Sequence, residues 1–372
     1  MTKHFDWVIV GAGFSGAVLA ERISNVQNKS VLIIEQRNHI GGNAFDFVDT
    51  NGILVHKYGP HLFHTNSEKV WQYISKFSEW DEYKHRVNAK FENFEIPLPI
   101  NINSLEILIG NSTDLFLNEV ELEFGHVSEI SIIKLIASKN SLVQSVGQLI
   151  FEKIFTEYSE KQWGISVNKV SPSTLSRIPV RLSRNDDHFS DSFQFLPKYG
   201  YNELFLNLLN NKNITIELNT EFNPKNHSGK IGTIFTGAID QLNSYSNGYL
   251  PYRSLRFNHQ QLTNKNFQKV AQVNYTDSTP FTRIIDYGKL YHYKDSKTTI
   301  VYEYPMAHDH KTTIPFYPID SDENKKLHKD YIEITNKKFP MMLMTGRLAD
   351  YRYFNMDQVI AKSLTLFETL VK

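Results

Sequence analysis

Residues 5–16 of this chain read FDWVIVGAGFSG, and this stretch decides the fold. Residues 5–10 are typical of a buried parallel β-strand, a glycine-rich turn follows at once, and residues 17–23 are typical of a helix. A second β-rich run, residues 31–34, ends at Glu35. This order of strand, turn, helix and strand is the context that the glycine fingerprint of a dinucleotide-binding domain requires. The sequence therefore predicts a Rossmann-like domain at its beginning.

The three glycines of the turn have separate tasks. Gly11 permits the tight turn, Gly13 lets a pyrophosphate approach the backbone, and Gly16 lets the helix pack closely on the strand. The free amides at the positive end of the helix then face the pyrophosphate. At the end of the second strand, Glu35 can accept hydrogen bonds from a ribose diol and would repel a 2′-phosphate. The alternative is a glycine-rich turn that binds nothing.

The residues after Glu35 favour FAD over NAD. Residues 36–43 read QRNHIGGN, and an arginine two residues after the acid, followed by paired glycines, resembles FAD enzymes of the glutathione-reductase and amine-oxidase type. Residues 233–238 and 341–345 are later strand-like runs, and residues 356–370 have helical periodicity. This last helix could aim its amino terminus at a flavin carbonyl. An ordinary return from strand to helix explains that segment equally well.

Composition excludes several classes of protein. The chain has 372 residues, 40 basic and 40 acidic side chains, and no cysteine, so disulfides, thiolate nucleophiles and Cys-type zinc sites are ruled out. The balanced charge favours neither nucleic acid nor an anionic membrane. The longest uncharged stretch, residues 7–20, is shorter than the roughly 20 apolar residues of a membrane span. We therefore expect a soluble cytoplasmic protein that does not insert into membranes.

Cofactor segments that lie far apart in the sequence imply a discontinuous domain with insertions. Residues 101–170 show the apolar spacing of several short helices, and residues 250–305 alternate β-branched and aromatic side chains as antiparallel strands do. The expected fold class is α/β, with a discontinuous Rossmann-like FAD-binding domain, an inserted helical domain and an antiparallel β-sheet domain. The expected domain bounds are 1–80 with about 200–245 and 335–372 for FAD, 101–185 for the helices with a mobile substrate loop, and 81–100 with 246–334 for the sheet.

Several blocks of sequence together resemble the UDP-galactopyranose mutase family. They run in the family's order over essentially the whole chain, at residues 11–16, 37–43, 56–65, 161–164, 177–181, 280–284, 316–318 and 346–353. The resemblance implies an isomerase that interconverts the pyranose and furanose forms of a nucleotide-diphosphate sugar, usually as a homodimer. It implies that FAD is active when reduced by an external reductant, and that its N5 forms a covalent adduct with the sugar.

The same resemblance assigns site residues. Arg177 and Arg283 match arginines that hold the diphosphate, and the polar stretch before Arg177 matches a mobile loop. His61 and His64 match residues near the reactive face of the flavin, so these four form the implied catalytic set. The implied substrate-binding residues are Tyr158, Ser159, Trp163, Phe189, His188, His85, Tyr317, Tyr353 and Asn355. The implied cofactor-binding residues are Gly11, Gly13, Phe14, Ser15, Gly16, Glu35, Gln36, Arg37, Gly42, Asn43, Gly59, Pro60, His61, Gly237, Gly346, Arg347 and Met356.

Three positions depart from the family pattern and leave the sugar open. His188 stands where a tyrosine is usual, His85 where an asparagine is common, and Asn355 where an aspartate is usual; Ser159 for threonine is milder. Neutral drift explains such changes, but so does a different sugar, because an amide offers a donor that a carboxylate lacks. UDP-galactopyranose is the first candidate substrate. UDP-N-acetylgalactosamine and a dTDP-linked 6-deoxyhexose such as dTDP-fucose are the alternatives.

Two other classes of protein and a metal site compete with the isomerase. A conventional FAD-dependent oxidoreductase would share the amino-terminal motif, but it gives no reason for paired arginines beside tryptophan and tyrosine. A catalytically inactive FAD-binding scaffold is the second rival. His56, His61 and His64 invite a metal site, but Gly59-Pro60 breaks any helix that would align them and no carboxylate cluster accompanies them. We therefore expect no metal.

Overall fold

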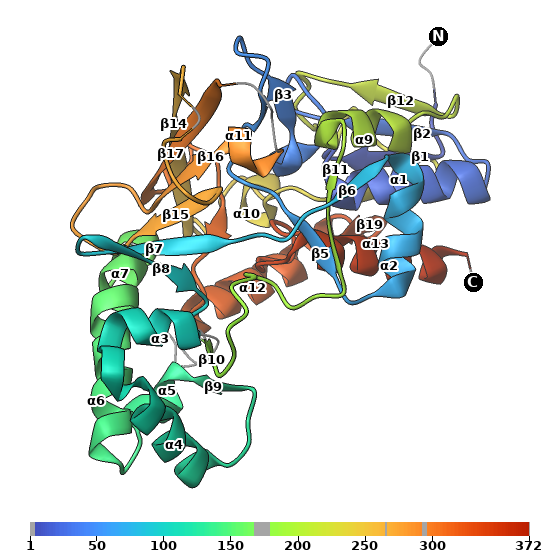
Figure 1. Ribbon diagram of the computed structural model, residues 1–372. Helices are drawn as coiled ribbons and strands as arrows, with labels where there is room; N and C mark the ends of the chain where they lie inside the picture. The colour runs from blue at the N-terminus through green and yellow to red at the C-terminus, as the bar shows by residue number, and fades with distance from the viewer. Residues whose placement is uncertain (1–3, 167–178, 265, 292–295, 372) are drawn as a thin grey trace.

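A five-stranded parallel sheet, in the order β12-β2-β1-β13-β19, forms one layer of the molecule (Figure 1). The computed structural model describes residues 4–166, 179–264, 266–291 and 296–371. The central strands are buried on both faces, which is why their sequences are almost continuously apolar. The strands are β1 (Trp7–Val10), β2 (Val31–Ile34), β12 (Ile214–Glu217), β13 (Gly232–Phe235) and β19 (Met342–Met344).

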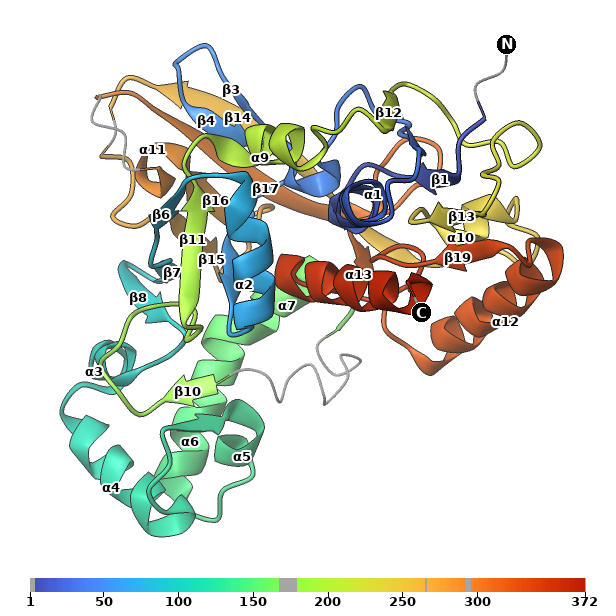
Figure 2. The same ribbon diagram turned by 90° about the vertical axis from the view of Figure 1, so that its right-hand side faces the viewer.

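Helices from both ends of the chain cover this sheet. α1 (Phe14–Val26) packs against α13 (Met356–Leu370) and α9 (Gly200–Leu208), and Figure 2 shows α13 beneath α1. Ile9 and Ile23 lie in this core with no exposed surface. The parallel sheet and the helix at 356–370 match the sequence expectation, because their apolar runs are long and bounded by glycine or polar residues.

The second sheet has seven strands, in the order β18-β14-β17-β16-β15-β7-β8. All its strand pairs are antiparallel except β15 with β7, which is parallel. The sheet is thus mainly antiparallel, as the sequence predicts, and its one parallel pair among the described strands joins β15 to a strand almost 200 residues earlier in the chain. The strands are β7 (Val87–Phe91), β8 (Phe94–Leu98), β14 (Tyr252–Leu262), β15 (Gln272–Tyr275), β16 (Arg283–Asp286), β17 (Thr298–Ala307) and β18 (Tyr317–Pro318).

A helical lobe lies below β7 and β8 (Figure 1) and has its own apolar core. Asn101 and Ser104 form a capping box at the start of α3, and Asn140 accepts hydrogen bonds from the first amides of α6. A π-helical turn over residues 151–156 joins α6 to α7 in one helical run. The helices are α3 (Ile102–Ile109), α4 (Thr113–Phe124), α5 (Ile132–Ile136), α6 (Ser141–Ile150) and α7 (Glu157–Trp163), beside the strands β9 (Glu129–Ser131) and β10 (Pro179–Arg181).

The remaining elements join these parts. They include a three-stranded antiparallel sheet, β5-β11-β6, and the antiparallel pair β3-β4. They are β3 (Asp46–Val48), β4 (Leu54–His56), β5 (Phe63–Thr65), β6 (Trp80–Glu82) and β11 (Phe193–Pro197), with helices α2 (Glu68–Ile74), α10 (Ile239–Leu242), α11 (Tyr287–Leu290) and α12 (Asp322–Lys338). The expected domain bounds stay a prediction.

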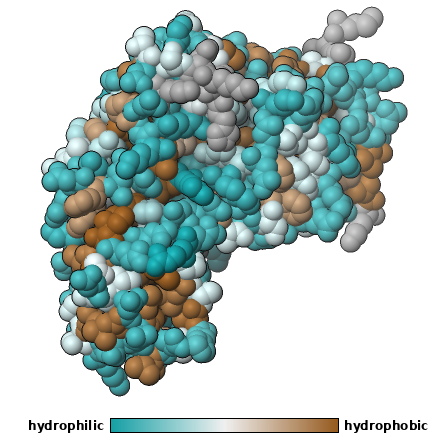
Figure 3. All heavy atoms as spheres, in the orientation of Figure 1, coloured by the Kyte–Doolittle hydropathy of each residue, from teal (hydrophilic) through white to brown (hydrophobic). Residues whose placement is uncertain are grey.

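The surface is mainly hydrophilic on the face seen in Figure 3, with hydrophobic residues gathered on the helical lobe. Ile107, Leu115 and Leu122 are exposed there on α3 and α4. Within the described residues, none of the helices is both long and apolar enough to cross a membrane.

Candidate active site

A cavity of about 1120 Å³ opens at the carboxyl ends of the parallel strands. In α/β sheets this edge is where ligands bind. One end of the cavity is lined by the glycine turn after β1, and the other by residues of the seven-stranded sheet and its neighbours. The cavity therefore connects a dinucleotide-binding turn to a separate polar chamber.

The glycine turn has the close packing that its sequence predicts. Gly11 has a φ of +99°, and a Cβ there would lie 2.2 Å from Thr236 Oγ1. A Cβ on Gly16 would lie 2.0 Å from the carbonyl oxygen of Gly11, so Gly16 serves packing and does not line the cavity formed by the described residues. Gly13 is the N-cap of α1, and no side chain caps the helix. The first amides of α1 are therefore available to an anion.

Glu35 and Arg37 form the polar wall beside this turn. Glu35 is buried and accepts hydrogen bonds from the backbone amides of Ala12 at 2.8 Å and Arg37 at 2.9 Å. Arg37 donates from Nη2 to Asn43 Oδ1 at 3.0 Å and lies over the Tyr58 ring. Its Nη1 is buried and has no hydrogen-bond partner among the described residues. A phosphate group would satisfy that donor.

The loop at residues 59–61 forms the middle of the cavity. Gly59 has a φ of +88°, and a Cβ there would lie 3.3 Å from Glu303 Oε2. His61 Nδ1 donates to the Gly59 carbonyl at 2.8 Å, which leaves Nε2 as the acceptor of the ring, and the His61 amide donates to His56 Nδ1 at 2.9 Å. Burial, together with the charges of Arg347 and Arg283, lowers the pKa of His61 to about 4. His61 is therefore neutral at pH 7.

Arg283 lines the cavity and forms an ion pair with the buried Glu303. They are directly opposite in the antiparallel register of β16 and β17, and their side chains approach to 2.8 Å. Burial opposes the charge on Arg283, but the carboxylate of Glu303 outweighs it and raises the arginine pKa. Tyr158 and Tyr317 also act electrostatically on this guanidinium. A charged donor is thus held at the chamber end of the cavity.

A wall of aromatic rings faces that chamber. His64 stacks on Phe189 with ring centroids 3.8 Å apart, and its Nδ1 lies 2.9 Å from Asp191 Oδ2. His85 and His188 pack edge to face at 5.7 Å. The rings of His64, Phe189, His85 and His188 all line the cavity.

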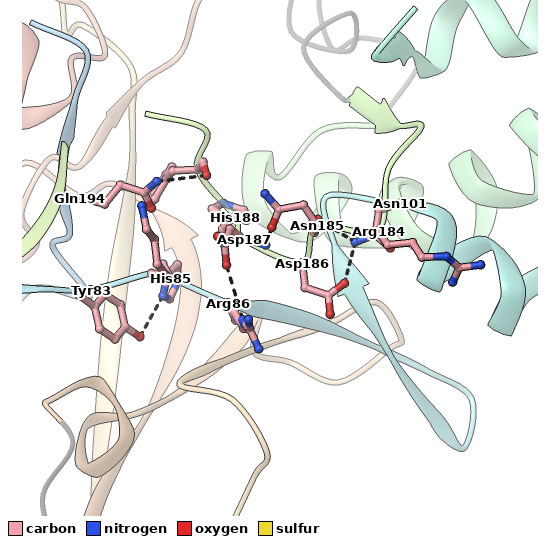
Figure 4. Close-up of polar contacts among 12 residues, drawn as sticks. Tyr83, His85, Arg86, Asn101, Arg184, Asn185, Asp186, Asp187, His188 and Gln194 are labelled. Carbon is pink, nitrogen blue, oxygen red and sulfur yellow. Dashed lines mark hydrogen bonds and ion pairs between the residues drawn. The ribbon is translucent and has the colours of Figure 1, made fainter. Parts of the chain in front are cut away.

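Hydrogen bonds fix both histidines of this wall, and Figure 4 shows the contact between His85 and Tyr83. His188 Nδ1 lies 3.2 Å from the Leu98 carbonyl, so this nitrogen carries the proton, and burial lowers the pKa of His188 to about 4. His85 contacts the Tyr83 hydroxyl at 3.3 Å and also hydrogen-bonds with Gln272; burial lowers its pKa well below the usual value. Both rings are therefore neutral hydrogen-bonding groups at pH 7.

The backbone that carries His188 is anchored on both sides. Arg181 donates to the carbonyls of Asp187 and His188, and Asn101 donates to Asp186 Oδ1 at 2.8 Å (Figure 4). Arg86 reaches Asp187 at 3.6 Å from the neighbouring strand segment. The placement of His188 thus depends on contacts of its segment with Asn101 and Arg86, which are far from it in sequence, and with Arg181.

The carboxyl-terminal segments close the cavity. Arg347 donates to the Phe316 carbonyl at 2.6 Å and lies over the Tyr353 ring, which packs against Tyr317 at 5.8 Å. Asn355 is the N-cap of α13, and its backbone N–H donates to Gln358 Oε1 at 3.0 Å. The other cavity-lining residues here that the sequence predicts are Gly237, Gly346 and Met356.

Tyr158, Ser159 and Trp163, which are predicted to bind the substrate, lie on α7. They are not among the described residues that line the cavity. The Trp163 ring packs edge to face against Tyr317 at 6.4 Å. Arg253 holds the end of α7 by donating to the carbonyls of Gln162 and Lys161. Arg177 and the polar stretch before it lie outside the described residues.

The other predicted residues come together in one place. Every predicted cofactor residue except Gly16 lines the cavity, and so do His64, His85, His188, Phe189, Arg283, Tyr317, Tyr353 and Asn355. Within the described part of the chain, His, Asp and Glu residues form no group of three or more that could hold a metal ion.

Sequence reasoning missed Glu303 and Gln272. Glu303 is 1% exposed, on the same strand face as the buried Val301, and Gln272 lines the cavity beside His85. A charged residue on the apolar face of an alternating strand was the available signal for Glu303. Gln272 carried no comparable signal, because its role depends on the pairing of β15 with β7.

The sheet, the glycine turn and the cavity define an α/β protein with a Rossmann-type dinucleotide-binding domain. Residues 9–77 match the model of an NAD(P)-binding Rossmann-like domain, and residues 153–353 match the model of the UDP-galactopyranose mutase family. The chain belongs to the UDP-galactopyranose mutase family. The predicted family, fold class and type of enzyme, an isomerase, are thereby confirmed.

Relatives of known name cover the whole chain. It is 34% identical to UDP-galactopyranose mutase of Mycoplasma genitalium, over 99% of this chain and 95% of that protein. It is 33% identical to a probable UDP-galactopyranose mutase of Klebsiella pneumoniae, over 96% and 92% of the two chains. It is 32% identical to dTDP-fucopyranose mutase of Escherichia coli, over 98% of each.

Two solved structures share the fold. The crystal structure of a reduced UDP-galactopyranose mutase matches with a TM-score of 0.71 and 14% identity, over 99% of this chain and 94% of that one. A putrescine oxidase variant matches with a TM-score of 0.55 and 12% identity, over 99% of each chain. The fold by itself is therefore shared by mutases and oxidases.

Proposed function

We propose that this protein interconverts the pyranose and furanose forms of a nucleotide-diphosphate sugar, with UDP-galactopyranose as the first candidate substrate. The observation that carries the proposal is the partly buried Arg283, which lines the same cavity as the glycine turn and is paired with the buried Glu303. A guanidinium matches a diphosphate in charge and in its several donors. Reactant and product are isomers, so the conversion consumes no net electrons.

FAD fits the cofactor end of the cavity. The unpartnered Nη1 of Arg37 and the uncapped amides of α1 offer donors for phosphate oxygens, and Glu35 offers an acceptor for ribose. When bound and reduced, the flavin would supply an electron-rich nitrogen that bonds to the anomeric carbon. An external reductant is therefore a proposed partner of the protein.

The chain's own residues would hold the rest of the substrate. Arg283 would bind the departing diphosphate, and Arg177 is its proposed second guanidinium. Neutral His61 would add no further positive charge beside Arg283. Tyr317 and Tyr353 would line the sugar pocket, as their packing beside Arg347 supports.

Turnover assays test the reaction class. The dithionite-reduced holoenzyme is expected to convert UDP-galactopyranose to its furanose isomer, resolved by liquid chromatography, at least 100-fold faster than the oxidised form. Consumption of an oxidant with an amine or alcohol would favour the oxidoreductase instead. FAD content without conversion of any nucleotide sugar would favour a catalytically inactive scaffold.

A dTDP-linked 6-deoxyhexose is the second candidate substrate, and UDP-N-acetylgalactosamine the third. The chain is about as similar in sequence to dTDP-fucopyranose mutase as to the UDP-galactopyranose mutases, which supports the dTDP-linked sugar as a candidate. The unusual His85, His188 and Asn355, which line the cavity, also support a sugar other than galactose. Values of kcat/KM for UDP-galactose, UDP-N-acetylgalactosamine and dTDP-fucose decide among them. A tenfold preference for one sugar identifies it, because one mismatched hydrogen-bonding group costs at least that much.

We also propose that the protein is a homodimer. The exposed Ile107, Leu115 and Leu122 of the helical lobe support an apolar contact with a second copy. Light scattering is expected to give twice the mass of one chain, and a monomer would contradict the proposal. The cytoplasmic location stays a prediction.

A further inference from the structure

Lys161, in the last turn of α7, makes an uncommon set of contacts with its side chain. Its Nζ donates to four backbone carbonyls, those of Tyr275 at 2.8 Å, Asp277 at 2.7 Å, Thr279 at 3.1 Å and Phe281 at 3.1 Å. An ammonium group has three N–H donors, so one cation is surrounded by more acceptors than it has protons. Every second carbonyl of the segment 275–281 therefore points at the same atom. We call these four oxygens the carbonyl cage.

The carbonyl cage is formed by the chain segment that leads directly to Arg283. This connection joins β15 to β16, and Arg283 follows Phe281 by two residues. The backbone hydrogen bond from Tyr275 to Thr282 closes the hairpin, and Asp277 Oδ1 accepts from the Thr279 hydroxyl at 2.6 Å. Four converging carbonyl dipoles repel one another unless a donor or a cation lies among them. The ammonium group of Lys161 thus stabilises the backbone conformation that precedes Arg283.

The same face of α7 carries a predicted substrate residue. Tyr158 lies three residues before Lys161, and residues with this spacing are neighbours on a helix surface. The charge of Arg283 acts on the Tyr158 hydroxyl, whose pKa is raised by burial and lowered by that charge. On the other side, Arg253 of β14 holds the carbonyl of Lys161 itself at 3.2 Å. In Figure 1, α7 lies just below β15.

We propose that Lys161 is a positioning residue for the nucleotide-sugar site, because its ammonium group ties α7, which carries Tyr158, to the hairpin that carries Arg283. Lys161 itself would touch neither substrate nor cofactor. The proposal rests on the proposed function, since it assumes that Tyr158 and Arg283 bind the substrate.

The test removes the ammonium group and then returns a cation to the cage. Lys161→Ala is expected to keep its FAD and its melting temperature to within a few degrees, while kcat/KM falls about 100-fold, the cost of a small misplacement of binding groups. Propylammonium or K⁺ is expected to restore at least tenfold of that loss, and tetramethylammonium to restore none, because it has no N–H and is too large for the cage. Lys153→Ala is the matched control: Lys153 is exposed on the same helical run, and its substitution is expected to change kcat/KM less than twofold with or without these ions.

Three outcomes would overturn the proposal. The first is a kcat/KM of Lys161→Ala within threefold of that of the unmodified protein. The second is a fall in kcat/KM that no small cation restores. The third is a loss of bound FAD or of cooperative unfolding, which would make Lys161 a structural residue. In the last case Lys161→Arg gives a second measurement. The wider guanidinium cannot lie among the four oxygens as an ammonium does. If Lys161 is a positioning residue, Lys161→Arg is therefore expected to be a folded holoprotein whose KM rises more than tenfold. Unchanged kinetics of Lys161→Arg would contradict the proposal.

The unmodified protein separates this proposal from the proposed function. If it converts no nucleotide sugar, the proposed function fails, and Lys161 is judged by whether Lys161→Ala weakens UDP binding tenfold in a calorimetric titration. If the unmodified protein converts a sugar and Lys161→Ala converts it equally well, only the role of Lys161 fails.

Discussion

Arg283 and Glu303 show how a single strand register places a charge at a cavity wall. Removing two charges from water is costly, so each is tolerated only because the other lies 2.8 Å away. The pairing of β16 with β17 puts the two residues directly opposite, with their side chains on one face of the sheet. The Nε of Arg283 is buried with no hydrogen-bond partner among the described residues, so the pair still leaves a donor for a ligand.

Arg283→Ala is expected to lower turnover about 1000-fold with FAD retained, because a charged donor to the diphosphate is lost. It is also expected to lower the free energy of unfolding by about 3 kcal/mol, because Glu303 is left buried and unpaired. The double variant Arg283→Ala with Glu303→Gln is the control: it should recover most of the stability and none of the turnover. Steady-state kinetics and urea unfolding measure the two effects. Loss of FAD from Arg283→Ala would show that the arginine serves the cofactor instead.

At the scale of secondary structure, local pattern predicts single elements well and their pairing poorly. The apolar run 31–34 and the helix 356–370 have the bounds that the sequence predicts, since each is set by residues within it. The parallel pair β15-β7 was not predictable from either strand, because hydrophobic alternation does not say which strand lies alongside. The cap of α6 is local again: Asn140 Oδ1 accepts from the amides of Leu142 and Val143 at 2.9 and 3.2 Å.

Asn140→Ala is expected to lower the free energy of unfolding by about 1 kcal/mol, because two amides of α6 lose their acceptor. FAD content and turnover are expected to stay unchanged, since α6 lies away from the cavity. Urea unfolding at fixed pH measures the difference. Asn118→Ala, at an exposed position in the middle of α4, should change stability by less than about 0.5 kcal/mol. Equal effects of the two substitutions would contradict a role for the cap.

At the scale of the whole molecule, folding keeps four histidines neutral, and three of them, His61, His85 and His188, line the cavity. Burial lowers the pKa of His61 and of His188 to about 4, and it lowers the pKa of His56 and His85 well below the usual value. His56 has no exposed surface, accepts from the His61 amide and contacts the Tyr291 hydroxyl at 2.6 Å. Each of these rings would bind a proton near pH 6.5 in the unfolded chain.

Stability is therefore expected to fall as the pH is lowered from about 6.5 toward 4. In that range the unfolded chain binds more protons than the folded one, so the free energy of unfolding decreases as pH decreases, by up to about 1.4 kcal/mol per pH unit for each buried imidazole. Urea unfolding at pH 7.5 and pH 5 measures it. His56→Gln should reduce this dependence, whereas His126→Gln should not, because the His126 side chain is 92% exposed. An equal reduction by both variants would contradict the assignment to buried rings.

The sequence by itself determined the Rossmann-like beginning and the family, and it singled out most residues that line the cavity at the glycine turn, because a glycine turn between two apolar strands is a local pattern whose backbone geometry only glycine satisfies. Only the tertiary structure decided that Glu303 pairs with Arg283, that Gln272 reaches His85, and that Lys161 gathers the carbonyls before Arg283. Each of these contacts joins segments from different elements. Burial and charge pairing depend on which strands and helices lie side by side, and that is a property of the packed chain.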